Sequence, residues 1–369
     1  MAALTATILI PDISGFTEFM TTTELEHGSH IISSFLETIV KSADENFEVS
    51  EIEGDAVLFY KKGEPISKKE LLDQCLKIFN AFHYQRKMIQ QLTVCPCGVC
   101  QSMINLSLKF IAHFGTISEI KVNRFTKASG LDMIIAHRLL KNKIPSNEYV
   151  LITKSLLNQP NNNDEPVGLN WQMATEEFPA IGKVEFNYAI LENVKQNIPD
   201  PPKPNTHYTV DDDSPYIETE IQANFKDVYA IVSDMNMRVH WIEGLRNVEL
   251  GEASGPYIGS IQHFVFDHFK VMVSPLSLKL SDKEIIYAET WNGEEINLSA
   301  VCEFRLRHVD ITDCHLVNRV LAAEDKVLVP EVKTLLMQKL LASSENLKTY
   351  CENIINAGDA VTDIENGFS

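Results

Sequence analysis

Two aspartates near the N-terminus lie next to apolar stretches. Asp12 closes the run "ILIPD", and Asp55 lies in the turn of "EIEGDAVLFY", between two short strand patterns. In a sheet whose first strand lies beside that hairpin, the two carboxylates converge at one edge and repel each other unless a cation lies between them. The pair predicts a site for two divalent ions, Mg²⁺ or Mn²⁺, on triphosphate oxygens. Taken singly, each acid is a turn residue or a helix N-cap.

Three cysteines lie within one short segment. "CPCGVC" places Cys95, Cys97 and Cys100 close enough for three thiolates to reach one Zn²⁺, with His83 or His113 as a fourth ligand. The spacing is not that of a zinc ribbon, so a cluster of buried free thiols stays an alternative. The chain has seven cysteines, an odd number that favours reduced thiols or a metal over a disulfide framework, and we expect a cytoplasmic protein.

The elements that position the aspartates alternate between strand and helix patterns. Helices are expected at 24–46, 67–90 and 129–141, and strands at 5–13, 47–53, 56–60, 104–111, 116–122 and 149–153. The order βαββαβ predicts a ferredoxin-like sheet with its helices on one face.

The second half of the chain predicts a different architecture. A strand at 216–223 and a short helix at 225–234 precede several strands between 248 and 320, and Pro330 opens a long final helix. We expect a curved antiparallel sheet wrapped around that helix, so the fold class is α+β in both halves. A Pro-rich, acidic linker at 193–215 separates the two expected domains, 1–192 and 216–369.

Composition restricts the classes of function. The chain has 369 residues, 44% of them hydrophobic, which is enough for two domains with cores of their own. Its net charge of -19 argues against a general affinity for nucleic acid or anionic membranes, because both would repel an acidic surface. No apolar run is long enough to span a bilayer, and the N-terminal run lacks the basic flank of a signal peptide.

Three segments resemble the motifs of the class III nucleotidyl cyclases, the adenylate and guanylate cyclases. "PDISGFTEF" and "EIEGDAVLFY" resemble the two metal-binding motifs, and "ASGLDMIIAHRLL" resembles the third motif of that family. The resemblance covers roughly residues 5–192. It implies that Asp12 and Asp55 bind the two metal ions, with the Ile13 carbonyl as a further ligand. It also implies a homodimer, because in this family each site takes its metal acids from one subunit and its arginine from the other.

The same resemblance implies roles for two cations. Arg138 falls where the family has its transition-state arginine, which offsets charge on the α-phosphate and the leaving pyrophosphate. Lys183, in "AIGKVEF", is near the place of the phosphate-binding lysine. Ile134 stands where the family has a ribose-orienting asparagine, and it cannot hydrogen-bond. The alternative for Arg138 is a surface helix residue paired with a neighbouring acid.

The residues that read the base are inverted relative to adenylyl cyclases. The family's base-reading lysine and acid are replaced by Glu51 and Lys127, respectively. Because glutamate accepts hydrogen bonds and lysine donates them, the pair complements an N–H next to a carbonyl, as in guanine or uracil. We therefore expect GTP, and second UTP, over ATP. The alternative is an intersubunit salt bridge between Glu51 and Lys127 in an inactive site.

The second half resembles the START-like helix-grip (SRPBCC) superfamily. The segment "FKDVYAIVSDMNMRVHW" carries the resemblance, which implies an apolar cavity between sheet and helix for a lipid or an aromatic small molecule, lined by Trp241 and Trp291. Alternatively, those side chains fill the space themselves.

These expectations combine into two hypotheses. The first is a nucleotidyl cyclase that converts a nucleoside triphosphate to a 3′,5′-cyclic nucleotide and pyrophosphate, regulated by a hydrophobic ligand of the second domain. The second is a catalytically silent nucleotide-binding or dimerisation scaffold fused to a small-molecule carrier. Ile134 favours the second, and the intact Asp12 and Asp55 favour the first.

Overall fold

The computed structural model describes residues 3–21, 25–94, 103–123, 125–159, 168–210, 214–251, 255–323 and 330–356. The chain forms two compact units. The first contains Met1–Lys87 and Ser102–Pro201, and the second contains Met88–Gln101 and Pro202–Ser369. The expected division thus differs in two places, because the start of the linker belongs to the first unit and the segment Met88–Gln101 belongs to the second.

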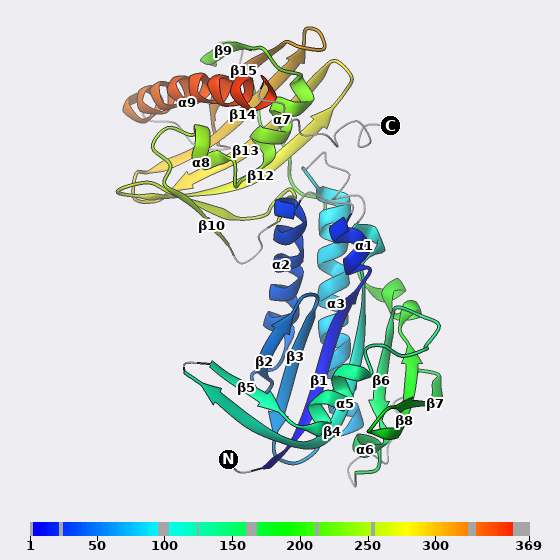
Figure 1. Ribbon diagram of the computed structural model, residues 1–369. Helices are drawn as coiled ribbons and strands as arrows, with labels where there is room; N and C mark the ends of the chain where they lie inside the picture. The colour runs from blue at the N-terminus through cyan, green and yellow to red at the C-terminus, as the bar shows by residue number, and fades with distance from the viewer. Residues whose placement is uncertain are drawn as a thin grey trace. The chain divides into compact units, whose positions relative to one another are not determined.

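The first unit is built on a mixed sheet (Figure 1) in the order β2-β3-β1-β4-β6-β8-β7, with β5 paired to β4. Its strands are β1 (Leu4–Ser14), β2 (Glu48–Glu53), β3 (Ala56–Lys62), β4 (Ser107–Val122), β5 (Phe125–Ser129), β6 (Tyr149–Thr153), β7 (Trp171–Phe178) and β8 (Gly182–Ile190). β1 runs antiparallel to both β3 and β4. The order β2-β3-β1-β4 is that of the predicted ferredoxin-like motif.

β4 is one continuous strand, where the sequence predicted two. The residues between the two predicted strands, Ala112–Gly115, stay in register with Leu9–Ala6 of β1, so the ladder of β1 carries β4 through the predicted break. Local strand propensity could not predict this continuity, because the strand that pairs with β4, β1, lies about a hundred residues away in the sequence.

The helices of the first unit are α1 (Phe16–Thr21), α2 (Leu25–Ser42), α3 (Lys68–Leu92), α5 (Leu131–Arg138) and α6 (Lys154–Leu157), with 3₁₀ turns η1 (Met103–Asn105) and η2 (Glu192–Asn197). Ile8 and Ile10 of β1 pack in one core cluster with Met133 and Ala136 of α5. Thr7 points to the opposite face of β1 and accepts a hydrogen bond from the backbone just before α3. The expectation that all helices cover one face is therefore wrong for α5.

The second unit is a curved antiparallel sheet with a long C-terminal helix, as predicted (Figure 1). Its sheet has the order β10-β11-β12-β13-β14-β15-β9. The strands are β9 (Tyr216–Ile221), β10 (Asn247–Leu250), β11 (Gln262–Val265), β12 (Lys270–Leu280), β13 (Glu284–Gly293), β14 (Leu298–His308) and β15 (Cys314–Ala322), and the helices are α7 (Phe225–Ser233), α8 (Arg238–Trp241) and α9 (Pro330–Asn356). Pro330 takes the first helical position of α9, which tolerates a residue without an N–H.

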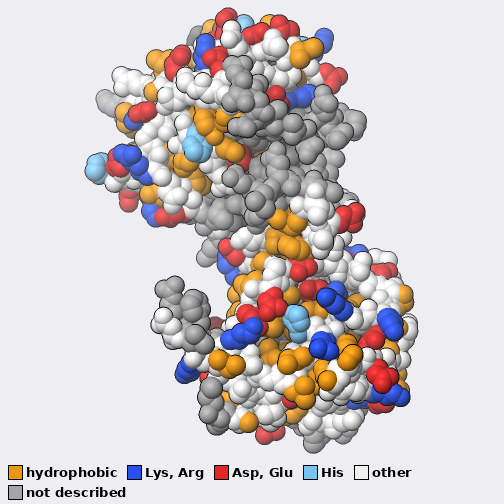
Figure 2. Space-filling view, in the orientation of Figure 1, with side chains coloured by type: hydrophobic (Ala, Val, Ile, Leu, Met, Phe, Trp, Pro, Cys, Tyr) orange, Lys and Arg blue, Asp and Glu red, His pale blue; other side chains and the backbone are white. Residues whose placement is uncertain are grey.

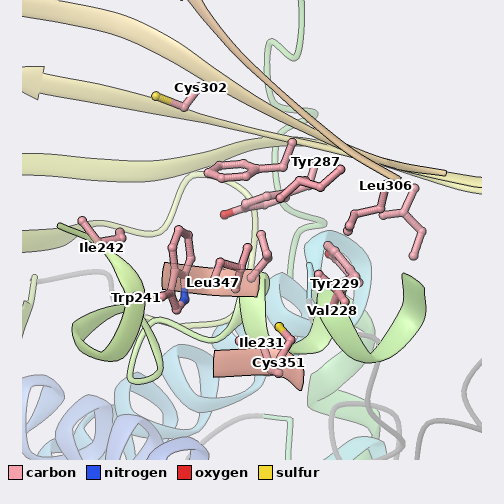
Figure 3. Packing of buried hydrophobic residues seen from close by; sticks show 14 of the residues in the cluster. Val228, Tyr229, Ile231, Trp241, Ile242, Tyr287, Cys302, Leu306, Leu347 and Cys351 are labelled. Atoms are coloured by element: carbon pink, nitrogen blue, oxygen red, sulfur yellow. The ribbon is translucent and has the colours of Figure 1, made fainter. Parts of the chain in front are cut away.

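The core of the second unit lies between the sheet and the helices. Figure 3 shows Trp241 of α8 and Leu347 of α9 directed toward the strand face that carries Tyr287 and Cys302. In β14, Ala300, Cys302, Phe304 and Leu306 belong to this core, whereas Val301 packs on the opposite face of the sheet with Ala288 and Leu321.

The residues after α3 belong to the second unit through backbone pairing. The Val94 N–H donates to the Pro256 carbonyl at 2.9 Å, and the Ile258 N–H donates to the Leu92 carbonyl at 2.7 Å. The Val94 side chain is 1% exposed within the core of that unit. A helix that begins in the first unit thus ends as a structural part of the second.

The predicted linker is only partly a solvated spacer. Tyr208 packs on a small apolar cluster of Ala288, Val301 and Leu321, on the face of the sheet away from the main core, and its hydroxyl donates to a carboxylate oxygen of Glu303 at 2.7 Å. The Tyr208 ring thus buries apolar area while its hydroxyl is hydrogen-bonded. The proline content of the segment did not predict this contact.

Among the described helices, none is both long and apolar enough to cross a lipid bilayer.

Candidate functional site

Asp12 and Asp55 come together at the end of β1, as the sequence predicted. Asp12 pairs in register with Ala56, the residue after Asp55, and the Ile13 N–H donates to the Asp55 carbonyl at 3.0 Å. Asp12 is only 7% exposed. Burial, and next the neighbouring charge of Asp12, raise the pKa of Asp55 to about 6. The two carboxylates therefore repel each other in a partly dehydrated place, where a cation would be stabilised.

Lys109 of β4 joins this pair and was not anticipated. It lies opposite Asp12 in the strand register, and its Nζ is 2.8 Å from Asp12 Oδ2. It is the one lysine or arginine in the apolar stretch "LSLKFIAHF". That isolated charge was the available signal, but placing it beside Asp12 requires the register between β1 and β4.

The end of α5 reaches the same hairpin. His137 Nε2 is 2.9 Å from Glu53 Oε2, and Glu53 pairs with Ala56 at the hairpin turn. Burial would raise the pKa of Glu53, but its bonds and charges with Glu51, His137 and Lys127 lower it overall. Sequence reasoning missed both Glu53 and His137 as members of this charged group.

The cation expected at the end of α5 lies on the surface. Arg138 is exposed and forms no ion pair with another residue of the described ranges. Ile134, one turn earlier, is 50% exposed. Both side chains are thus available to a second molecule rather than engaged within the chain.

Glu51 and Lys127 lie next to each other, as their expected joint role requires. Lys127 Nζ forms an ion pair with Glu51, and it is 3.6 Å from Glu53 Oε1. The hydrogen bond to Glu51 raises the pKa of Lys127. The pair forms within one chain, which differs from the intersubunit salt bridge considered from the sequence.

Lys183 lies far from the carboxylates of its own chain. Lys109 is level with Tyr149 of β6, which pairs with Ile190 of β8, whereas Lys183 is at the other end of β8. Seven residues of strand span roughly 23 Å. Lys183 therefore does not reach Asp12 within one chain.

The cysteines of the predicted zinc site, Cys95, Cys97 and Cys100, lie outside the described residues. Within the described ranges, no three or more His, Cys, Asp and Glu side chains gather as a metal site. The two histidines considered as a fourth ligand have other neighbours. His83 is buried with its Nε2 3.3 Å from Glu148 Oε1, and His113 contacts Asp132.

His113 connects three elements of the first unit. Its Nε2 is 2.9 Å from Asp132 Oδ1 on α5, and its Nδ1 is 2.9 Å from the hydroxyl of Thr153 at the end of β6. Asp132 also accepts from the Thr116 N–H at 2.6 Å. The hydrogen bond from His113 lowers the pKa of Asp132. This network holds α5 on the sheet, and with it the side chains at the end of that helix.

The second unit contains a cavity of about 340 Å³. Trp241 and Trp291, the two side chains expected to line it, both do so, together with residues of α9. These two side chains therefore leave open space beside them.

The charged side chains of the first unit are mixed on the face that Figure 2 shows. Charges of both signs are interspersed there, so the net acidity is not gathered in one patch on that face.

The chain was compared with known proteins and solved structures. The model of a family described as "Protein of unknown function (DUF2652)" matches residues 32–149. The guanylyl cyclase Cya2 is 15% identical, with a TM-score of 0.40 over 51% of this chain and 92% of that one. The adenylyl cyclase CyaB from P. aeruginosa is also 15% identical, with a TM-score of 0.35 over 51% of this chain and 95% of that one. At these scores the similarity decides neither fold nor activity.

A sequence relative gives a clearer result. The uncharacterized protein Rv2561/Rv2562 of Mycobacterium tuberculosis (strain ATCC 25618 / H37Rv) is 31% identical over 160 residues, which make up 43% of this chain and 73% of the relative. The chain belongs to the family of this mycobacterial protein.

Proposed function

We propose that the first unit binds a nucleoside triphosphate with two divalent ions at Asp12 and Asp55 and converts it to a 3′,5′-cyclic nucleotide and pyrophosphate. The observation that carries the proposal is the meeting of these two carboxylates at the end of β1, with the pKa of Asp55 raised to about 6 by burial and by Asp12. The segments around Asp12 and Asp55 resemble the metal-binding motifs of the class III cyclases, which supports the proposed activity.

The residues present fit Mg²⁺ or Mn²⁺. The donor set is two carboxylates and the Ile13 carbonyl, all oxygen, which is the chemistry these ions prefer. Mg²⁺ is usually held by one or two carboxylates together with substrate phosphates rather than by a complete protein cage. Within the described ranges no third acid, histidine or cysteine joins the two carboxylates, which is consistent with that mode.

When bound, the ions supply charge neutralisation for the triphosphate and activation of the ribose 3′-hydroxyl. Asp12 and Asp55 hold the metal-bound triphosphate at the end of β1, and Lys109 adds a positive charge 2.8 Å from Asp12. The 3′-oxygen attacks the α-phosphorus, the bond to pyrophosphate breaks, and the hydroxyl proton passes to solvent.

The transition state requires a second copy of the chain. Arg138 is exposed, and Lys183 lies roughly 23 Å along the sheet from the carboxylates. A homodimer in which Arg138 and Lys183 come from the other subunit would supply guanidinium and ammonium charges to the α-phosphate and pyrophosphate.

The second candidate is a catalytically silent nucleotide-binding or dimerisation scaffold. Ile134 favours it, because a half-exposed isoleucine replaces the asparagine that orients the ribose in cyclases. In both cases we propose that the second unit is a START-like domain, whose cavity of about 340 Å³ beside Trp241 and Trp291 takes a lipid or aromatic small molecule.

The site is tested by nucleotide binding with Mn²⁺. Asp12→Ala and Asp55→Ala should each abolish Mn²⁺-dependent binding of GTP in calorimetry, because loss of one ligand leaves triphosphate charge uncompensated. Asp73→Ala, on the exposed side of α3, is the control and should bind as the parent chain does. Undiminished binding in both site variants would refute the metal site.

We also propose Zn²⁺ at Cys95, Cys97 and Cys100. Elemental analysis of chain purified without chelator should show about one zinc per chain. Metal-free protein would refute the zinc site and leave free cysteines as the alternative.

A further inference from the structure

A buried ion pair between Arg238 and Glu289 lies beside the two tryptophans that line the cavity of the second unit. Glu289 accepts two hydrogen bonds from Arg238, at 2.9 and 2.8 Å, one from the Tyr287 hydroxyl at 2.9 Å and one from Trp291 Nε1 at 2.8 Å. Arg238 and Glu289 are both fully buried. The guanidinium also lies 4.9 Å from the ring centre of Trp241. Trp291 is thus hydrogen-bonded to the ion pair and Trp241 packs against it, whereas Trp241 Nε1 and Arg238 Nε have no hydrogen-bond partner among the described residues.

Arg238 and Glu289 are paired with each other and are not among the lining residues, so they offer no partner to a charged ligand at the buried end of the cavity. An ionised group brought there would lose its hydration without gaining an opposite charge. The other buried lining residues include Val271, Cys302 and Phe304. Figure 3 shows that Cys302 lies on the sheet side of the core and Trp241 on the helix side. The inner part of a ligand must therefore be uncharged and apolar.

The exposed rim of the cavity is different, because charged side chains lie there. Lys339 of α9 is 52% exposed, and its Nζ is 3.9 Å from Glu243 Oε1, too long for a hydrogen bond. The rim acid Asp267 is already bound by Arg246 through two hydrogen bonds, at 2.8 and 3.0 Å. Glu243 also accepts from the amide of Asn346 at 3.3 Å. The acids of the rim are thus engaged, whereas Lys339 can accept an anionic partner.

The volume limits the size of the ligand. A cavity of about 340 Å³ holds about eleven groups of the size of water, whose share of liquid volume is about 30 Å³. That corresponds to on the order of a dozen non-hydrogen atoms. A sterol or a phospholipid with two chains is much larger.

We propose that the second unit binds one small anionic amphiphile of about a dozen non-hydrogen atoms, such as a medium-chain carboxylate, with its apolar body against Trp241 and Trp291 and its anionic head beside Lys339. This inference rests on the proposed role of the second unit as a small-molecule domain and is independent of the nucleotide site.

The probes are four ligands that differ in head or length: decanoate, decan-1-ol, decylamine and hexadecanoate. Calorimetry and tryptophan fluorescence of the full chain should show one decanoate per chain, with decan-1-ol about fivefold weaker, as expected from the loss of one partly exposed ion pair. Decylamine should bind more weakly than decan-1-ol, because its positively charged ammonium group would be repelled by Lys339. Hexadecanoate should bind no more tightly than decanoate, since its extra carbons stay in water.

Substitutions test separately the contact of the ligand head with Lys339 and the contact of its apolar body with the cavity. Lys339→Met should weaken decanoate about fivefold and leave decan-1-ol unchanged. Lys333→Met, an exposed position of the same helix, should change neither. Val320→Phe, which places a ring among the lining residues, should abolish binding of both ligands, while Ile311→Phe on the surface should not. Thermal melting confirms that each variant is folded, and Leu336→Trp on α9 replaces Val320→Phe if that chain does not fold.

Four results would overturn the proposal. Equal binding of decylamine and decanoate, or no effect of Lys339→Met, would refute the anionic head while leaving an apolar cavity. Much tighter binding of hexadecanoate would refute the size limit. Binding of no probe by the folded chain would refute the small-molecule role of the second unit, whatever the nucleotide measurements give.

Discussion

At the scale of single residues, the arrangement of charge around Asp12 decides what the first unit can do. Asp12 faces Lys109 on one side and Asp55 on the other. The ammonium group offsets part of the negative charge, but the pKa of Asp55 is still raised to about 6 by burial and by Asp12. The chain thus retains an electrostatic cost in its ligand-free state that a divalent cation would relieve.

This cost can be measured with Asp55→Asn. Because the pKa of Asp55 rises from 3.8 to about 6 on folding, the folded state holds the proton more tightly than the unfolded state. Stability should therefore fall as the pH rises from about 4 to about 6 and stay level above that, by up to roughly 3 kcal/mol. Asparagine mimics the neutral acid, so Asp55→Asn should melt higher than the parent at pH 7 without metal and should show a weaker pH dependence.

The control is Asp73→Asn, whose carboxylate forms an exposed ion pair with Lys69. It should melt within a degree or two of the parent chain, since exposed pairs contribute little. A lower melting temperature for Asp55→Asn at pH 7 would mean that the Asp12 and Asp55 charges do not oppose each other.

We expect Glu51 and Lys127 to determine which nucleotide base the first unit prefers. Glu51 and Lys127 already form an ion pair, so a base must replace that contact with two of its own. Guanine or uracil can do so, whereas adenine leaves both groups mispaired, at roughly 1–3 kcal/mol each. In competition binding with Mn²⁺ we expect GTP first, UTP second and ATP last. The exchanged double variant, Glu51→Lys with Lys127→Glu, should reverse the order, and a preference of the parent chain for ATP would contradict the assignment.

At the scale of elements, the packing of α5 against β4 determines where the end of that helix lies. Gly115 of β4 makes this packing possible, because a Cβ at that position would lie 2.1 Å from Cγ of Asp132. Asp132 in turn is held by His113 and by the Thr116 N–H. Any side chain at position 115 must displace the carboxylate and break this network.

Gly115→Ala should therefore destabilise the chain by about 2–4 kcal/mol, as overpacking combined with a lost buried network does. Combined with Asp132→Gly, which removes the clashing side chain, the same substitution should cost much less than it does alone. A double-mutant cycle by thermal or urea unfolding measures this coupling. Strict additivity would show that Gly115 and Asp132 do not share the space described.

Acid should weaken the same contact. Because the hydrogen bond from His113 lowers the pKa of Asp132, the ionised acid is stabilised on folding. That contribution is present at neutral pH and is lost as the pH falls through the folded pKa of Asp132. Asp132→Asn should remove this acid-dependent part of the unfolding free energy.

The sequence predicted the elements whose signals are local. The hairpin at Gly54 and Asp55, the first-turn Pro330 of α9 and the strand "YVLIT" follow from turn chemistry and periodicity. The meeting of Asp12 with Asp55 could be predicted because the hairpin adjoins the first strand. Lys109 and His137 could not, because their positions depend on strand register and helix docking between distant segments.

At the scale of the whole chain, the division into two units does not follow the sequence order. The segment after α3 completes the core of the second unit, where Val94 is buried and the Tyr229 hydroxyl donates to its carbonyl. A polypeptide that starts at the linker lacks this segment. Its core would carry a gap, and the Pro256 carbonyl and the Ile258 N–H would lose their hydrogen bonds to Val94 and Leu92.

A fragment of residues 202–369 should therefore be less stable than the same unit within the full chain, by several kcal/mol. A synthetic peptide of residues 88–101, added under reducing conditions, should raise its melting temperature, and the rise should grow with the logarithm of the peptide concentration. The matched control is the same peptide with Val94→Asp, which should not do so. A fragment that melts as the full chain does, with no response to the peptide, would show that the segment is dispensable.

The central claim is that the carboxylate pair supports cyclisation of a nucleoside triphosphate, and product analysis tests it most directly. Purified full-length chain is incubated with Mn²⁺ and each of the four nucleoside triphosphates, and the products are identified by mass spectrometry beside Asp12→Asn and Asp73→Asn chains. The account predicts a 3′,5′-cyclic nucleotide, formed fastest from GTP, by the parent and the Asp73→Asn chain and none by Asp12→Asn. Absence of cyclic product from all four nucleotides, or equal product from Asp12→Asn, would contradict it.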